Sequence, residues 1–352
     1  MNYAEYLART IYEHLAAGMP VVLASIISQQ GSTPRNSGTK MVIGEDSKIY
    51  GTIGGGLLES DSIQESARVI AKKKSTFREF ELNGTGVGSE NMICGGKAAV
   101  LLDYIAPTSK NSSFFQSFND AIAGGSDFYS VTYFGGKNDD LCLAGRSLFL
   151  PEGKMIGDSP LPASDVKKLE SEMHNISTVE MLTFGDVKVV VDRIRRLKTL
   201  YCFGAGHVAV PTAHLASLVG FRVCVLDDRH EFASSSRFPD ADRLAIIKDF
   251  EHAFEGLDID SDSFIVILTR GHQFDSIVLE QALRTKAGYI GMISSQKKKE
   301  AIFQYLLGKG FTKQALARVH APIGIKIGAQ TPEEIAVSIV AELISLRSGI
   351  TM

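Results

Sequence analysis

A glycine-rich turn in the second half of the chain has the residue pattern of a phosphate-binding loop. In the segment FGAGHVA, Gly204 permits a tight turn, Gly206 lets a phosphate approach the backbone, and Ala209 stands where a small residue allows helix and strand to pack. An apolar, strand-like run precedes the turn and a helical run follows it. This context predicts a dinucleotide-type fold that binds a phosphate at the start of the helix.

Charged side chains near this turn extend the candidate site. Asp227 ends the next expected strand about twenty residues on, where a carboxylate accepts hydrogen bonds from a ribose. It should favour an unphosphorylated ribose, a preference that neighbouring Arg229 would weaken. In the segment TRGHQFD, His272 and Asp275 follow the fourth expected strand, at the sheet edge where open α/β folds bind ligands. Two alternatives stay open: Asp275 caps the next helix, and His207 is only a solvent-facing residue.

A second glycine-rich cluster lies near the N-terminus. The segment GSTPRNSGTKM supplies Arg35 and Lys40, and GTIGGGLLE places consecutive glycines at the start of an expected helix: Gly54, Gly55 and Gly56. Unpaired N–H groups and the helix dipole favour a phosphate or carboxylate at such a position. The alternatives are a tight turn without a ligand and, for Glu59 in the first helical turn, simple compensation of the dipole.

Cys94 differs from the other cysteines because it lies in a glycine-rich loop, ENMICGGK. Backbone amides there can stabilise a thiolate, which is a soft ligand for a transition metal such as molybdenum or a carrier of sulfur. The alternative is a loop thiol that fills a small gap. Cys142, Cys202 and Cys224 lie in apolar, strand-like runs and are expected in the core.

The composition of the chain limits the partners and the cellular location that we expect. A net charge of −3 over 352 residues offers no basic field for a nucleic acid. The first residues lack the pattern of a signal peptide, and no apolar window is long enough to span a membrane, so we expect a cytoplasmic location. The cysteines are too widely spaced for a zinc pair or a disulfide framework.

The order of the expected elements predicts an α/β protein of two domains. Residues 1–195 combine a helix over 3–17, a hairpin, a helix after the three glycines and further strands, with the strands of 126–194 completing a mixed sheet. Residues 196–352 alternate strands and helices, which predicts a Rossmann-like, doubly wound parallel sheet. The boundary falls in the basic segment RIRRLK.

Several long segments resemble one known family. GSTPRNSGTKM and GTIGGGLLE are similar to the N-terminal signature of XdhC/CoxI proteins, and FGAGHVA, VLDDRHEFA and RFPDAD are similar to their Rossmann half. APIGIKIGAQTPEEIAVSIVAELI resembles the closing signature, so only residues 105–195 are unmatched. One departure is Ser294, which stands where a glycine of the family's Gly-Ser turn is expected and so weakens the case for ligand approach at that loop.

The resemblance implies a maturation chaperone. Such a protein binds the molybdenum cofactor, as molybdopterin or its dinucleotide form, protects it during installation of the sulfido ligand, and delivers it to a xanthine dehydrogenase-type hydroxylase. A cysteine desulfurase is a second candidate partner. In this reading Arg35 and Gly54–Gly56 hold the cofactor phosphate and Cys94 lies near the metal. The chain lacks the iron–sulfur cysteine spacings of the hydroxylase itself.

Two other functional classes stay open. An NAD(P)-dependent oxidoreductase would use His207 and His272 as its acid–base groups, because these are the plausible proton donors expected near the nucleotide edge. A nucleotide-sensing protein would bind the ligand and contact a partner without catalysis. The apolar stripe of the last helix, which includes Ile339 and Leu343, is either core or the seam of a homodimer.

Overall fold

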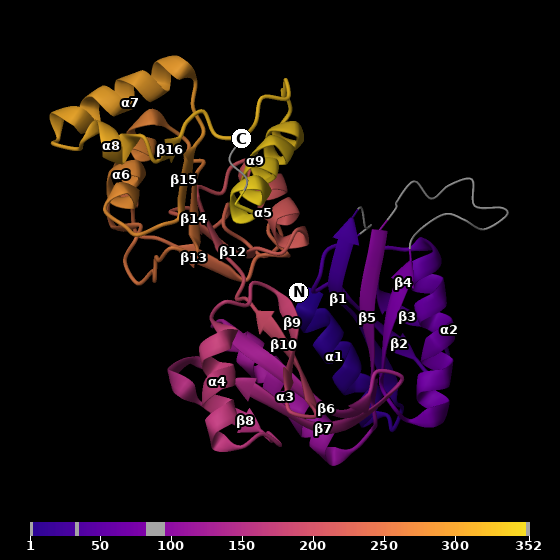
Figure 1. The fold of residues 1–352 in the computed structure, drawn as a ribbon. Coiled ribbons are helices and arrows are strands. Elements are labelled where there is room, and N and C mark those ends of the chain that lie inside the picture. Colours follow the sequence, from indigo (N-terminus) through magenta and orange to yellow (C-terminus); the bar gives the residue numbers. More distant parts are fainter. Residues whose placement is uncertain (1–2, 32–34, 82–95, 350–352) are drawn as a thin grey trace. The chain divides into compact units, whose positions relative to one another are not determined.

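The protein folds as two compact units, Asn2–Arg196 and Leu197–Met352, which we call the N-terminal and C-terminal units. The computed structural model describes residues 3–31, 35–81 and 96–349 (Figure 1). In these described segments, no helix has both the length and the apolar character that crossing a membrane requires.

The N-terminal unit begins with an antiparallel sheet, here called the first sheet. Its strand order is β3-β2-β1-β5-β4. The strands are β1 (Val21–Gly31), β2 (Lys40–Gly44), β3 (Ile49–Gly51), β4 (Thr76–Glu81) and β5 (Gly96–Ile105). Every neighbouring pair in it is antiparallel, so β1, β3 and β4 run in one direction and their carboxyl ends lie at the same end of the sheet.

Residues 126–194 form a second sheet, and the prediction that they complete a single mixed sheet is wrong. The order is β8-β7-β6-β10-β9, again antiparallel throughout. The strands are β6 (Phe128–Lys137), β7 (Asp140–Phe149), β8 (Met155–Gly157), β9 (Val179–Phe184) and β10 (Val187–Ile194). Apolar residues on both faces of β10 explain this: Val189 faces helix α4 (Ala163–Met173), and Val190 packs against the first sheet. Such strands need a layer on each side.

Helices cover both faces of the first sheet. Alternating residues of β1 divide between them, with Val22 and Ile26 packed under α2 (Gly56–Lys72) and Val21 packed with α1 (Tyr3–Ala16) and α3 (Ser109–Ala123). Figure 1 shows α2 along the outer side of this sheet and α1 on the opposite side. The arrangement fixes the start of α2, where the three glycines lie, directly after β3.

Ion pairs between strands join the two sheets. Arg146 of β7 donates to both carboxylate oxygens of Asp103 of β5, at 3.0 and 2.8 Å, and the two side chains are only 5% and 3% exposed. Lys40 of β2 binds Asp192 of β10 at 2.9 Å. Burial raises the pKa of Asp103 against the opposing effect of Arg146. The Asp103 carboxylate therefore depends on Arg146 for its charge.

The C-terminal unit has a parallel sheet of order β13-β12-β11-β14-β15-β16. Its strands are β11 (Thr199–Phe203), β12 (Arg222–Asp227), β13 (Arg243–Ile246), β14 (Ser263–Ile267), β15 (Tyr289–Met292) and β16 (Val319–His320). This is the Rossmann strand order. All strands are parallel, and the direction in which the chain adds strands to the sheet reverses between β11 and β14. The prediction of a doubly wound parallel sheet is confirmed.

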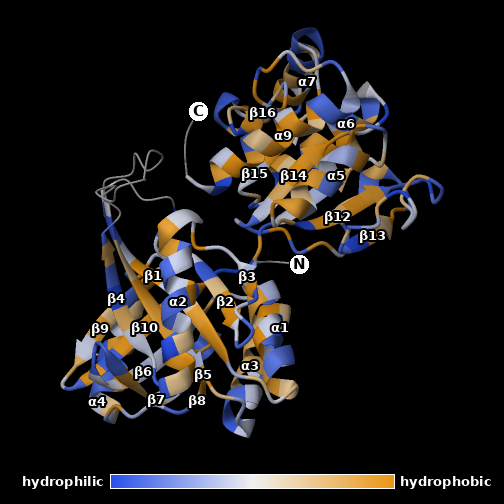
Figure 2. Ribbon diagram, turned by 90° about the vertical axis from the view of Figure 1, so that its right-hand side faces the viewer, coloured by the Kyte–Doolittle hydropathy of each residue, from blue (hydrophilic) through white to orange (hydrophobic). Residues whose placement is uncertain are grey.

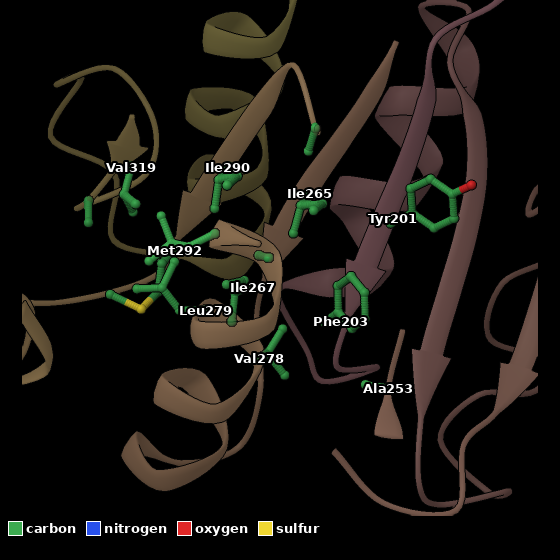
Figure 3. Close-up of a cluster of buried hydrophobic side chains, with 14 of the residues drawn as sticks. Tyr201, Phe203, Ala253, Ile265, Ile267, Val278, Leu279, Ile290, Met292 and Val319 are labelled. Atoms are coloured by element: carbon green, nitrogen blue, oxygen red, sulfur yellow. The ribbon is translucent and has the colours of Figure 1, made fainter. Parts of the chain in front are cut away.

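Helices pack on both faces of the parallel sheet. Helices α5 (Ala209–Leu218) and α9 (Pro332–Arg347) cover one face. The other face carries η2 (Phe250–His252), α6 (His272–Leu283), α7 (Gln296–Gly308) and α8 (Lys313–Leu316). Figure 3 shows the side chains on this second face, with Phe203, Ile267 and Leu279 among them. Strand β14 is coloured as hydrophobic in Figure 2 and contributes to both faces, with Phe264 and Val266 on the side of α5 and α9 and Ile265 and Ile267 on the other.

The cysteines and the apolar residues of α9 differ in whether they lie in the core. Cys202 and Cys224 are buried, as predicted. Cys142 is exposed, so its placement in the core is wrong: it lies near the β6–β7 turn, where Leu143 is also 40% exposed. Ile339 and Leu343 of α9 are fully buried within the C-terminal unit, so they belong to the core and are not available as a dimer seam.

Replacing Arg146 with methionine should destabilise the N-terminal unit by about 3–5 kcal/mol, because the Asp103 charge would stay buried without its partner. The loss should shrink as the pH falls, since a carboxyl whose pKa is raised in the folded state binds protons more readily there than in the unfolded chain. Chemical unfolding of the full chain measures both effects. The double variant Asp103→Leu/Arg146→Met is the control and should recover most of the stability; equal losses in the two variants would contradict the argument.

Candidate functional site

The turn after β11 is shaped by two glycines with different surroundings. Gly204 has a φ of +106°, and a Cβ on it would overlap the backbone carbonyl of Leu268, after β14. Its N–H donates to the carbonyl of Leu226 at 2.7 Å. Gly206 has no atom within 4 Å of the position of an added Cβ. The backbone is therefore closed at Gly204 and open at Gly206, where a phosphate has room to approach the start of α5.

The same turn is held from both sides by neighbouring segments. The N–H of Ala205 donates to Asp227 at 2.8 Å. The carbonyl of Ala205 accepts a hydrogen bond from the Arg237 guanidinium at 2.8 Å, and the same nitrogen binds the carbonyl of Phe232. These contacts fix the loop before any ligand arrives. Sequence reasoning missed Arg237, although it lies in the segment RFPDAD.

Asp227 lies at the carboxyl end of β12 as expected, but its surroundings do not suit a ribose ligand. The carboxylate is 1% exposed. Besides the Ala205 N–H it accepts three hydrogen bonds from Arg229: from the backbone N–H at 3.0 Å, from Nε at 2.9 Å and from an Nη at 3.0 Å. The two oxygens of a carboxylate offer about four lone-pair positions. All are in use, so Asp227 positions the loop and Arg229.

A second ion pair crosses the carboxyl end of β11. Arg270, which follows β14, donates through two nitrogens to the carboxylate of Asp228, which follows β12. The hydrogen bond from Arg270 holds the pKa of Asp228 below its usual value. Because β11 lies between β12 and β14 in the sheet, this pair spans the mouth of the glycine turn.

Asp275 is also engaged inside the protein. It is fully buried, accepts a hydrogen bond from Thr269 at 2.6 Å and forms an ion pair with Lys298 near the start of α7. Burial raises the pKa of Asp275 in spite of these partners. It does not cap α6, whose cap residue is Gly271. Lys298 is only 13% exposed.

The remaining predicted residues of the C-terminal site lie at helix starts. His207 is exposed directly after Gly206, and His272 is the first residue of α6. Ser294 precedes the cap of α7, where Ser295 accepts the N–H of Lys298 at 3.2 Å. The glycine turn, His207 and the starts of α6 and α7 thus share the carboxyl edge of the sheet.

In the N-terminal unit, Gly54 and Gly55 precede α2 and Gly56 begins it, and the carboxylate of Glu59 already lies at this helix start. Gly54, Gly55 and Gly56 have φ values of +126°, +72° and +62°, which side chains rarely adopt. The N–H of Gly55 donates to Glu59 at 3.2 Å, and the hydroxyl of Thr52 donates to the same Glu59 oxygen at 2.6 Å. The N–H of Gly54 binds the Thr52 hydroxyl at 3.1 Å. The Glu59 carboxylate thus compensates the positive end of the α2 dipole, with no external anion.

Tyr3 of α1 completes this cluster. Its hydroxyl donates to the carbonyl of Lys40 at 2.7 Å and accepts the N–H of Thr52 at 2.9 Å. Burial raises the pKa of Tyr3, and the charge of Arg35 acts in the opposite direction, so Arg35 lies within electrostatic reach of this hydroxyl. The ammonium group of Lys40 is turned to Asp192, so its charge is already paired. Tyr3 and Thr52 carried no sequence signal of their own.

The topology brings the glycine-rich segments to one end of the first sheet. Gly31 ends β1, Gly51 ends β3 and Glu81 ends β4, and these strands run in the same direction. Gly31 pairs with Gly96, the first residue of β5. Cys94 lies outside the described residues, in the segment between Glu81 and Gly96. Among the side chains that the structure describes, no group of three His, Cys, Asp or Glu residues could hold a metal.

Both units match models of one protein family. Residues 200–343 match the XdhC Rossmann domain, and residues 14–81 match the model of the XdhC and CoxI family. The chain belongs to the XdhC and CoxI family. The glycine turn with its arginines lies in the first match, and Arg35, Lys40, the three glycines and Glu59 lie in the second.

Relatives of known name extend over nearly the whole chain. It is 27% identical over 334 residues to a probable xanthine dehydrogenase subunit of Bacillus subtilis (strain 168), covering 94% of each chain. It is 22% identical over 342 residues to the molybdenum cofactor insertion chaperone PaoD of Escherichia coli (strain K12), covering 97% of this chain and 88% of that protein. A crystal structure of a xanthine dehydrogenase from Bacillus halodurans superposes with a TM-score of 0.79 at 26% identity, covering 100% of this chain and 97% of that one.

The two glycines of the C-terminal turn should respond differently to one added methyl group. Gly204→Ala should destabilise the C-terminal unit by more than about 2 kcal/mol, because the positive φ and the overlap with Leu268 both oppose a side chain. Gly206→Ala should change stability by less than about 1 kcal/mol, because its Cβ enters open space. Urea unfolding compares the two; similar losses would show that the turn is not asymmetric in this way.

Proposed function

We propose that this chain is an accessory protein of a molybdenum hydroxylase, which binds the molybdenum cofactor and delivers it to a xanthine dehydrogenase-type enzyme. The observation that carries the proposal is the match of both units to the XdhC and CoxI family, together with the nearly end-to-end similarity to PaoD, named a molybdenum cofactor insertion chaperone. We further propose that the protein protects the cofactor while its sulfido ligand is installed. A cysteine desulfurase would be the source of the sulfur.

The C-terminal turn fits a phosphate of such a ligand. The open space over Gly206 and the start of α5 are suited to a phosphate group, and Gly204 is closed off by the backbone after β14. Exposed His207 is the next side chain along. We assign the phosphate of the bound cofactor, or of a nucleotide attached to it, to the residues Gly204–His207.

The N-terminal cluster fits an anion only if Glu59 moves. Its carboxylate already accepts the N–H of Gly55, so a phosphate at Gly54–Gly56 has to replace it, with Arg35 nearby as a cation. Cys94 belongs to a segment that begins and ends at the same end of the sheet, and its thiolate would be a soft ligand for molybdenum or sulfur. Lys40 is not part of this arrangement because Asp192 pairs with it.

Purification of the full chain from a molybdenum-replete host should yield protein that carries molybdenum and a releasable pterin. Metal analysis and chromatography of the released ligand provide the measurement. Gly206→Val fills the open space over the turn and should lower pterin retention at least about tenfold, whereas the smaller Gly206→Ala serves as the folded control. Bound NAD(P) in place of a pterin, with substrate-dependent hydride transfer, would instead identify an oxidoreductase.

Cys94→Ser should leave the fold intact while lowering either cofactor retention or the activity of a co-expressed hydroxylase. An independent check is thiol labelling in a Cys142→Ser background, because Cys142 is exposed and would otherwise react. Burial raises the pKa of Cys202 to about 12 and that of Cys224 to about 11, so both should react slowly. Cys94 should react fastest, and cofactor should protect it. Normal maturation of the hydroxylase by Cys94→Ser would assign the cysteine to packing.

A further inference from the structure

The end of β12 presents arginine donors at the position where dinucleotide folds place an acceptor for a ribose. Asp227 occupies the acceptor position, but four internal hydrogen bonds fill its oxygens and leave it 1% exposed. A ribose diol needs a carboxylate oxygen with a free lone pair. The carboxylate of Asp227 cannot supply one without breaking a bond to Ala205 or Arg229.

Arg229 is the group that this arrangement offers to a ligand. Two of its nitrogens, Nε and one Nη, bind Asp227, and its guanidinium lies 3.6 Å from the centre of the Phe232 ring. The head group is therefore fixed in direction and plane. Its side chain is 26% exposed, and within the described part of the chain no hydrogen bond is made by the second Nη. A fixed guanidinium with a free N–H edge is suited to a phosphate oxygen.

Two further arginines surround the same point. Arg270 binds both oxygens of Asp228 while one of its nitrogens lies 4.0 Å from Asp227, and its side chain is 37% exposed. Arg237 lies 4.9 Å from the centre of the Phe232 ring, on which Arg229 also packs. The cluster holds three guanidinium groups and two carboxylates, so positive charge is in excess. The carboxylates orient Arg229 and Arg270, since each carboxylate is engaged by a fork of two nitrogens. Arg237 is held by the carbonyls of Ala205 and Phe232.

We propose that the end of β12 binds a phosphate monoester of the ligand, so that the C-terminal unit prefers a 2′-phosphorylated dinucleotide to the unphosphorylated form. This reverses the preference expected from Asp227 alone, because that carboxylate is neutralised by Arg229 and turned inward. The inference rests on the proposed function only in requiring that the glycine turn binds a phosphate-bearing ligand. Beyond the proposed function, it names the chemical group, a phosphate monoester, that the end of β12 selects beside the glycine turn.

Calorimetry of the full chain with NADP⁺ and with NAD⁺ tests the preference directly. NADP⁺ should bind about tenfold or more tightly, and the ratio should fall as salt is added, because the extra contact is ionic. Arg229→Ala should abolish the ratio and improve NAD⁺ binding, since it frees oxygens of Asp227. Arg284→Ala is the matched control: it removes an exposed arginine at the far end of α6, beside Glu280, and should leave the ratio unchanged.

If Arg229→Ala does not fold because Asp227 loses its cation, Arg229→Ala/Asp227→Ser removes both charges and should likewise lose the preference for NADP⁺. Equal or tighter binding of NAD⁺ by the unmodified chain would overturn the inference, as would a full preference for NADP⁺ in a folded variant without Arg229. Failure of both dinucleotides to bind would also overturn it. Co-purified pterin is read separately, so that last result would leave the proposed accessory function standing.

Discussion

The C-terminal site depends on one close approach of backbone to backbone, at Gly204. The N–H of Gly204 reaches the carbonyl of Leu226, and its Cα lies against the chain after β14 so closely that no side chain fits. The segments that follow β12, β11 and β14 are thereby brought together where the strand order reverses. Next to this approach, Asp227 binds the N–H of Ala205, and the backbone at Gly206 is open.

In both units the chain supplies its own carboxylate beside the glycines, but the two carboxylates act differently. Glu59 accepts an N–H at the start of α2, so it occupies the position that an external anion would take. Asp227 lies beside the glycine turn without covering Gly206, and its remaining oxygens hold Arg229 in place. An anion at the N-terminal cluster has to compete with an internal group, whereas the C-terminal turn is already arranged to receive one. Affinity at the first site is therefore reduced by the cost of displacing Glu59.

The sequence was most informative where contacts are local. The alternation of strands and helices after residue 198 predicted the parallel sheet, because each β–α–β unit is specified within about thirty residues. Contacts between distant segments were not predictable in this way: Lys40 pairs with Asp192, which is 152 residues away, and the face-to-face packing of the two antiparallel sheets depends on such contacts. The side-chain geometry of Arg229 was hidden for a different reason. Its position beside Asp227 was visible, but residue types alone do not show that Arg229 donates three hydrogen bonds to that carboxylate or that the distant Ala205 N–H donates the fourth.

The buried pair of Asp275 and Lys298 bears on what the C-terminal site can do. Both groups lie at the carboxyl edge of the sheet, and each neutralises the other, with Thr269 as a further donor to Asp275. A general acid or base has to reach its substrate and exchange a proton with it. Asp275 is fully buried and Lys298 is 13% exposed, so this pair is better suited to holding the starts of α6 and α7 together than to moving protons. The pair therefore contributes to the structure of the edge, and the side chains left exposed beside the glycine turn include those of His207, Arg229 and Arg270.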